Sequence, residues 1–447
     1  MKKNQLYLLS IIVFFVLIAA IIFKYNVSKI EDENKIYSLL ERKGTAANSE
    51  EWKQTKEKAN SFLAAINRDP LDKKSQLGLA ALFIQEARIS GDYAYYDQAA
   101  MKTINDVLRI DSNNFEALVY QSLIYYSQHH FAEGLATAEK AKNINPYNAY
   151  VYGLMIDGNV EMGNYDSAIV NADRMVAIRP DLTSYSRISY IREIHGDYKG
   201  AIEAMKLAVE AGGPGDEYTE WSRVQLASLL EKTGDYMNAE MLYNISLNLR
   251  PDYPFAIAGL GRMQIAKKQY DSAVVYFKKA NGLIDDNGIK ESLADAYRLA
   301  GKNNESKKMA EAIIYELSLN AEAGNKDESI GHYADRELAY AYLKAGDKDK
   351  ALEHALFEYN RRPQNIDVNE TVAWVYYNRG EIEKALPYIK TAMKTNSKNP
   401  VFINRAALIF YKAGEKDLAK SLIAQTAAIN SHIDPILQAE TLSVMQN

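Results

Sequence analysis

The sequence predicts an all-α protein, a solenoid of about ten stacked helical hairpins. Two observations predict this fold. A small residue recurs in equivalent surroundings at spacings of 33 to 38 residues, with a single spacing of 45. A glycine-containing turn precedes many of these residues, and a proline follows several of them. The recurring small residues, called anchors below, are Ala99, Gly134, Ala168, Ala201, Ala239, Ala273, Ser306, Ala351, Ala385 and Ala419.

The stretch 163–180 shows how one unit is built. Gly163 follows an apolar helical pattern and supplies the positive φ that the end of a helix commonly needs. Apolar residues after it recur at helical spacing, so a second helix begins beyond the turn. Ala168 and Ala172 are small and therefore let the two helices approach closely. Pro180 lacks a backbone N–H and disfavours helix in the residue before it, so it separates this hairpin from the next.

The turns share a specific pattern. They read GNYDSA at 163–168, GDYKGA at 196–201, GDYMNA at 234–239 and, without the glycine, KQYDSA at 268–273. Over residues 72–430 the chain therefore resembles the tetratricopeptide repeat family, whose pattern places Gly-x-Tyr-x-x-Ala between the two helices and Pro after the second. The resemblance implies a right-handed solenoid. The chain also resembles bacterial, envelope-linked members of this family that have no assigned activity.

Segments outside the regular units are interpreted as two ends and one insertion. Residues 51–67 place apolar side chains at helical spacing and predict a capping helix. The long spacing after Ser306 contains the polar stretch NAEAGNKDESIG, which predicts a loop or a lengthened helix end. Residues 432–446 predict a closing helix. We therefore expect residues 51–447 to form the repeat domain, with capping helices at both ends.

The N-terminal region contains an uncharged apolar segment. After a short tail, residues 1–5, the stretch 6–23 would form a helix of about 27 Å, close to the roughly 30 Å core of a bilayer. We interpret it as an uncleaved transmembrane helix in a lipid bilayer, with a cleaved signal peptide or a buried helix as alternatives. Residues 24–50 then read as a juxtamembrane tether. The expected location is a single-pass membrane protein whose repeat domain is periplasmic or extracytoplasmic, and the reverse topology stays open.

The composition excludes several classes of function. Lys and Arg total 53 and Asp and Glu 58, and the resulting net charge of −5 gives no electrostatic case for nucleic-acid binding. The absence of cysteine excludes disulfides, thiolate metal sites and a cysteine nucleophile. Phosphate-binding glycine loops and the common hydrolase and metalloprotease motifs are also missing from the sequence. We therefore expect no cofactor, no metal and no enzymatic activity.

The family resemblance implies that the first helix of each hairpin lines a concave groove, and counting back from each anchor projects this chain onto that groove. The projected positions are rich in aromatic residues and carry charges of both signs. Aromatic and Arg side chains are frequent energetic anchors of protein interfaces. The alternative, that these rings pack between hairpins, stays open. The expected partner-binding residues are Tyr150, Tyr190, Trp221, Phe255, Arg262, Tyr333, Arg336, Tyr340, Trp374 and Tyr377.

These observations predict a membrane-anchored scaffold that binds protein or peptide partners of unknown identity, in the assembly or organisation of an envelope complex. The alternative is an accessory component of an envelope enzyme system, with a ligand pocket in the solenoid. We expect Trp374 and Tyr340 to contribute most of the binding energy, because truncating a buried aromatic anchor commonly costs about 2 kcal/mol or more.

Overall fold

The computed structural model describes residues 13–18, 36–326, 331–430 and 435–446. The chain from Glu41 onward forms one compact unit, and the residues up to Leu40 form a separate one. Within the described ranges every regular element is a helix.

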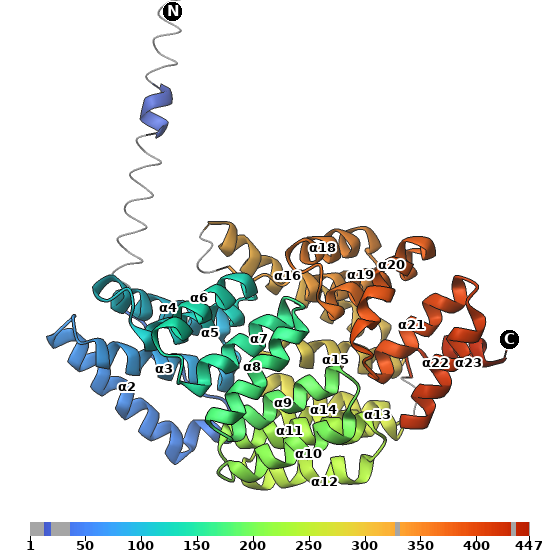
Figure 1. The fold of residues 1–447 in the computed structure, drawn as a ribbon, viewed down its shortest axis with the longest axis horizontal. Coiled ribbons are helices and arrows are strands. Elements are labelled where there is room, and N and C mark those ends of the chain that lie inside the picture. Colours follow the sequence, from blue (N-terminus) through green and yellow to red (C-terminus); the bar gives the residue numbers. More distant parts are fainter. Residues whose placement is uncertain (1–12, 19–35, 327–330, 431–434, 447) are drawn as a thin grey trace, which may run out of the picture. The chain divides into compact units, whose positions relative to one another are not determined.

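Ten helical hairpins follow one another along the compact unit (Figure 1). They are numbered 1 to 10 below, and each pairs a first helix with a second helix. The pairs are α3 (Lys73–Ser90) with α4 (Tyr93–Ile110), α5 (Phe115–Ser127) with α6 (Phe131–Ile144), α7 (Ala149–Glu161) with α8 (Tyr165–Ile178), α9 (Leu182–Ile194) with α10 (Tyr198–Ala211), α11 (Glu217–Lys232) with α12 (Tyr236–Leu249), α13 (Pro254–Ala266) with α14 (Tyr270–Leu283), α15 (Asn287–Leu299) with α16 (Asn303–Lys326), α17 (Asp335–Ala345) with α18 (Lys348–Arg361), α19 (Ile366–Arg379) with α20 (Ile382–Ala392), and α21 (Pro400–Lys412) with α22 (Lys416–Ile429).

Short elements complete this unit. The 3₁₀-helix η1 (Gly44–Asn48) and the helix α2 (Glu50–Arg68) precede hairpin 1. A second 3₁₀-helix, η2 (Met393–Thr395), extends hairpin 9, and α23 (Gln438–Gln446) follows hairpin 10. The prediction of a helical-hairpin solenoid of about ten repeats with a helix at each end is therefore confirmed.

The anchors mark where the two helices of a hairpin approach most closely. All ten lie in second helices, and the eight alanines among them are at most 1% exposed. At Gly134 a Cβ atom would overlap the ring of Tyr126 on the facing helix. The period of the sequence is thus the period of these close contacts, because a larger side chain would separate the helices at each one.

The long spacing after Ser306 arises from a helix. α16 spans 24 residues, which makes it the longest of the described helices. Of the two alternatives for this insertion, the lengthened helix end is the one observed. The four residues that follow, 327–330, lie outside the described part of the chain.

Residues about 200 positions apart contact one another along the solenoid. His130 and Gly331, for example, are 201 residues apart, close to six repeats of 34 residues. A constant separation of this size means that the solenoid coils into a superhelix of about six hairpins per superhelical turn, and that successive superhelical turns touch. We call this line of contacts the seam. Its hydrogen bonds include those from Thr45 Oγ1 to the Pro251 carbonyl (2.9 Å), from the Asp285 N–H to the Ser90 carbonyl (3.1 Å), from the Tyr333 N–H to the Gln128 carbonyl (3.0 Å), from the Ile366 N–H to the Tyr165 hydroxyl (2.9 Å) and from the Asn430 amide group to the Glu231 carbonyl (3.1 Å).

Hairpin turns of the first superhelical turn face loops of the second at very short range. Gly163 has a φ of +79°, and a Cβ atom there would lie closer than 3.0 Å to the backbone of Gln364. In hairpin 8, by contrast, the equivalent Gly346 has no such neighbour within 4 Å. The two superhelical turns are therefore packed backbone against backbone, which only a residue without a side chain allows at Gly163.

The predicted transmembrane helix is not supported. Of residues 6–23, the structure describes 13–18, a helical stretch of about 9 Å, whereas a bilayer core is about 30 Å thick. In the described part of the chain, no helix combines the length and the apolar character needed to cross a bilayer. The other residues of the predicted span, and the tail 1–5, lie outside that part. The predicted single-pass membrane location with an extracytoplasmic repeat domain is thus contradicted, and it is not retained.

The predicted tether, 24–50, is also shorter than expected at its C-terminal end. Residues 24–35 lie outside the described part, but the compact unit already begins at Glu41. Arg42 donates two hydrogen bonds to the buried carboxylate of Glu86 on α3, at 2.8 and 2.6 Å. This buried ion pair attaches the segment before α2 to the repeats, so the segment from Glu41 belongs to the solenoid.

Candidate functional site

Nine of the ten residues expected to bind a partner lie on first helices, as projected. Tyr333 instead lies in the loop before α17, where its ring stacks on His130 of the opposite superhelical turn with ring centroids 4.0 Å apart. Tyr333 is therefore a seam residue. The others are Tyr150 on α7, Tyr190 on α9, Trp221 on α11, Phe255 and Arg262 on α13, Arg336 and Tyr340 on α17, and Trp374 and Tyr377 on α19.

Four of these residues come together near the C-terminal end. The rings of Trp374 and Tyr377 stack with centroids 4.9 Å apart and an interplanar angle of 11°. The guanidinium of Arg405, on α21, lies 4.9 Å from the centre of the Trp374 ring and 5.3 Å from that of Tyr340. Arg336 lies 5.7 Å from the Tyr340 ring. We call these five residues the Trp374 cluster; it joins the first helices of hairpins 8, 9 and 10.

A buried carboxylate organises the Trp374 cluster. Glu370 on α19 is 6% exposed, accepts a 2.8 Å ion-pair contact from Arg405 and accepts a 2.6 Å hydrogen bond from the Tyr340 hydroxyl. Burial, together with this carboxylate, raises the pKa of Tyr340 to about 12. Although burial opposes the charge on Arg405, Glu370 raises its pKa above the usual arginine value. Both side chains therefore keep fixed protonation states at neutral pH.

Arg336 differs from Arg405 in its partners. Its Nε donates a 3.2 Å hydrogen bond to the Thr371 hydroxyl, and among the described residues no carboxylate lies within ion-pair distance of it. The remaining N–H groups of Arg336 are thus not committed to an ion pair in this part of the chain. A guanidinium beside an aromatic ring is a common recognition group for carbonyl and carboxylate oxygens.

Sequence projection missed Arg405 because of its position. Arg405 stands 14 residues before its anchor, an offset the projection did not include. Arg187 has the same offset from Ala201, and its Nη2 makes a 2.7 Å ion pair with Asp157 of the preceding first helix. In both hairpins, therefore, an Arg at this offset reaches back to an acidic residue, and charge at this position was the available signal.

Several other projected residues are bound within the repeat. Arg262 is paired with Glu231 at 3.0 Å and hydrogen-bonded at 2.8 Å to the hydroxyl of Tyr243, which is fully buried. This geometry favours the packing interpretation for Arg262. Tyr190, by contrast, is 40% exposed. The projected surface is therefore heterogeneous, and the Trp374 cluster is its most concentrated aromatic part.

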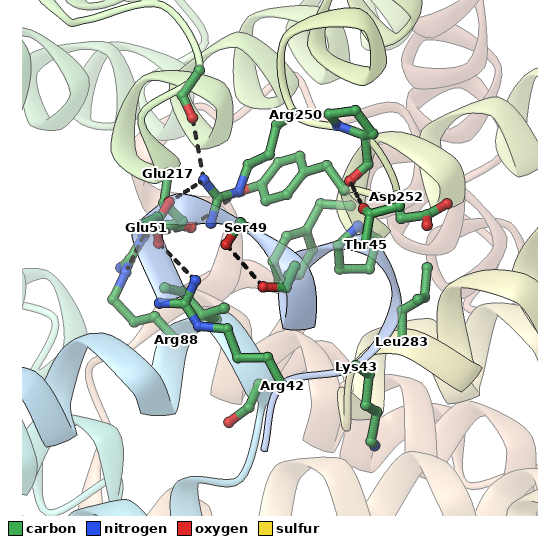
Figure 2. A pocket seen from close by; sticks show the side chains of 18 of the residues that line it. Arg42, Lys43, Thr45, Ser49, Glu51, Arg88, Glu217, Arg250, Asp252 and Leu283 are labelled. Atoms are coloured by element: carbon green, nitrogen blue, oxygen red, sulfur yellow. Dashed lines mark hydrogen bonds and ion pairs between the residues drawn. The ribbon is translucent and has the colours of Figure 1, made fainter. Parts of the chain in front are cut away.

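A cavity of about 380 Å³ lies at the start of the seam (Figure 2). It is bounded by the segment 41–49, the end of α3, and the loop between α12 and α13, and Phe255 lines it. Figure 2 shows Glu51 between the guanidiniums of Arg42 and Arg250, which it pairs at 2.8 and 3.0 Å. Arg88 pairs with Glu217 at 3.1 Å. Since these charges already have partners, the cavity is polar but internally neutralised.

Comparisons with known proteins add little to these observations. No family model and no curated protein matches the chain. Solved structures that resemble it include the APC/C hetero-tetramer Cut9-Hcn1, with 13% identity, a TM-score of 0.36, and coverage of 83% of this chain and 63% of that one. Another is a tetratricopeptide repeat protein from Parabacteroides merdae ATCC 43184, with 13% identity, a TM-score of 0.35, and coverage of 60% and 99%. Likeness at these TM-scores carries no argument here. The ten hairpins, their period and their Gly-x-Tyr turns are themselves those of a tetratricopeptide-type repeat protein.

Proposed function

We propose that this protein is a scaffold that binds protein or peptide partners on the concave face of its repeats, with the Trp374 cluster as the main anchor. The observation that carries the proposal is the stacking of Arg405 between the rings of Trp374 and Tyr340, which joins three successive first helices. Trp, Tyr and Arg are the residues that most often dominate the energy of protein interfaces. The envelope role expected from the sequence depended on the membrane span and is not part of this proposal.

Preorganisation supports the same surface. Glu370 holds the Tyr340 hydroxyl and the Arg405 guanidinium in one arrangement before any partner arrives. A partner therefore does not have to order these long side chains, which otherwise costs about 0.5 to 1.5 kcal/mol each. Arg336 supplies N–H groups for a carbonyl or carboxylate of the partner. The chemistry fits a polypeptide segment that places an apolar or aromatic side chain against the rings and an oxygen group against Arg336.

The test begins with the identity of the partner. Cross-linking in the native cell followed by mass spectrometry identifies proteins held by the repeats, and the affinity of the main partner is then measured. We expect Trp374→Ala combined with Tyr340→Ala to weaken binding at least about tenfold, because two aromatic anchors are lost. Tyr147→Ala is the matched control, since Tyr147 is 78% exposed in the loop between α6 and α7.

Two results would contradict this proposal. If the double variant binds with unchanged affinity, the anchor lies elsewhere on the solenoid. If it loses helix content and cooperative unfolding, as seen by circular dichroism, the rings belong to the core and the packing interpretation holds.

A second candidate function, binding of a small ligand, rests on the cavity at the start of the seam. Its volume of about 380 Å³ falls within the usual range of ligand pockets, about 300 to 1,000 Å³. A thermal-shift screen of small polar metabolites tests it, with Leu283→Trp as a variant that fills the cavity. A compound that stabilises the natural chain but not this variant would support the second candidate; equal stabilisation of both would exclude the cavity as its site.

A further inference from the structure

Histidines gather at the seam. The chain has six, and His129 and His130 form the turn of hairpin 2. His195 ends α9 directly before the Gly196 turn, and His332 lies in the loop that faces hairpin 2. His354 lies elsewhere, within hairpin 8, and His432 is outside the described part of the chain. This placement is specific to the contact between superhelical turns and is not used by the proposed partner site.

The histidines of hairpin 2 make the central contacts of the seam. Nδ1 of His129 lies 2.9 Å from the Tyr333 carbonyl oxygen, and Nε2 of His130 lies 2.7 Å from the Gly331 carbonyl oxygen. Because a carbonyl only accepts, each of these nitrogens must carry a hydrogen. The His129 ring also contacts the His332 ring, with centroids 4.3 Å apart.

The surroundings of His332 disfavour a positive charge. From the side of hairpin 2, His129 and His130 face it; from α17, Glu337 and Arg336 do. Burial first, and the neighbouring His129 second, lower the pKa of His332 to about 3, although Glu337 and the Ser127 backbone partly oppose this shift. His332 is therefore neutral while the seam is closed.

We propose that this histidine-lined contact is an acid-sensitive clasp, in which protonation of His332 separates the two superhelical turns and opens the concave face. The proposal rests on the proposed function for its biological use, since the opened face would be the partner site. The separation itself requires no partner and is measured without one.

The direction of the pH effect follows from linkage. An imidazole exposed by opening regains a pKa of about 6.5, so the open form binds a proton more tightly than the closed form. Opening should therefore become more favourable as pH falls below about 6.5. Glu337, whose pKa is lowered in the closed form, contributes in the same direction only below the usual range of glutamate. The interval from pH 7.5 to 5.5 thus isolates the histidine.

Hydrogen exchange of the full-length chain tests the clasp. The N–H of Tyr333 donates across the seam to Gln128, and the N–H of Leu338 donates within α17 to Ala334. From pH 7.5 to 5.5, we expect the protection factor of the Tyr333 amide to fall about tenfold, after correction for intrinsic exchange, while that of Leu338 falls much less. The radius of gyration from X-ray scattering should rise while far-UV circular dichroism stays constant.

Variants assign the effect. His332→Gln keeps a neutral polar side chain and should abolish the pH dependence; His354→Gln, which removes an imidazole inside hairpin 8, should leave it intact. If His332→Gln fails to fold, His129→Gln is the second variant and should weaken the dependence. An unchanged Tyr333 protection factor in the natural chain, or a dependence that persists in His332→Gln, would overturn the clasp while leaving the partner site untested by this result and open to its own binding assay.

Discussion

Nδ1 of His129 lies 2.9 Å from the carbonyl oxygen of Tyr333, which is 204 residues further along the chain. This contact shows that the solenoid has returned to its own first hairpins after about six repeats. An open solenoid contacts only its neighbouring repeats, so its stability is a sum of nearest-neighbour terms. Here a second set of contacts joins each repeat of the first superhelical turn to one of the second, and stability should depend on both sets.

A single methyl group at the seam tests this second set of contacts. Gly163→Ala would place Cβ against the Gln364 backbone, whereas Gly346→Ala meets no neighbour. Both residues have positive φ, so each substitution should cost about 1 kcal/mol from backbone strain alone. We expect Gly163→Ala to cost a further 1 to 3 kcal/mol or so, and to lower the melting temperature more than its control. Equal losses in the two variants would mean that the seam is not closely packed in solution.

The buried ion pair between Arg42 and Glu86 should hold the first segment against the repeats. Both side chains are at most 2% exposed. Arg42→Met would leave a carboxylate buried without its main partner, which typically destabilises a protein by about 3 to 5 kcal/mol. Arg42→Met combined with Glu86→Leu should recover most of that loss in thermal unfolding. Lys53→Met is the control, because its partner Glu50 is 70% exposed and such surface pairs contribute about 1 kcal/mol or less.

A different buried group, Asp97, should make stability fall with rising pH. It is 5% exposed, and its carboxylate accepts a 2.6 Å hydrogen bond from the Ser127 hydroxyl. Burial raises the pKa of Asp97 to about 7, from an ordinary value of 3.8. The folded chain therefore holds a proton that the unfolded chain releases, so this contribution is complete below pH 4 and is lost as pH rises to about 7.

Asp97→Asn should consequently raise the melting temperature at pH 8 and change it little at pH 4. The gain at pH 8 should approach about 4 kcal/mol at most, since one pKa unit corresponds to about 1.4 kcal/mol. Thermal unfolding at both pH values measures it, with Asp106→Asn as a control in the same helix. A gain that is the same at pH 4 and pH 8 would contradict a raised pKa of Asp97.

The hairpins could be predicted from the sequence because each repeat needs a small residue, such as Ala168, at the closest approach of its helices. The seam could not, because much of it joins backbone groups, such as those of Gly163 and Gln364, that carry no residue-type signal. One trace was present. The turn position that holds Tyr165 in hairpin 3 is aromatic in hairpins 1 to 6, and in hairpins 7 to 10 it is Asn303, Lys348, Ile382 and Lys416.

The candidate site could be predicted in part. Trp374 and Tyr377 are three residues apart on one helix, so their proximity follows from helical geometry. The approach of Arg405 depends on how tightly successive hairpins curve, which the period does not specify. Tyr333 was misplaced because the long spacing before hairpin 8 left the start of α17 uncertain, and the loop residue was counted as part of the helix.

Contact between the two superhelical turns is the central claim of this account, and thiol cross-linking measures it most directly. The chain has no cysteine, and the Asp285 N–H donates a 3.1 Å hydrogen bond to the Ser90 carbonyl across the seam. Ser90→Cys with Asp285→Cys should therefore form an intramolecular disulfide, or react with a short thiol–thiol cross-linker, under native conditions. Ser90→Cys with Asp347→Cys is the matched pair, since the Gly346 turn faces no second superhelical turn. Rapid cross-linking of the first pair alone is the predicted result; failure of the first pair to cross-link while both thiols react singly would contradict a closed seam.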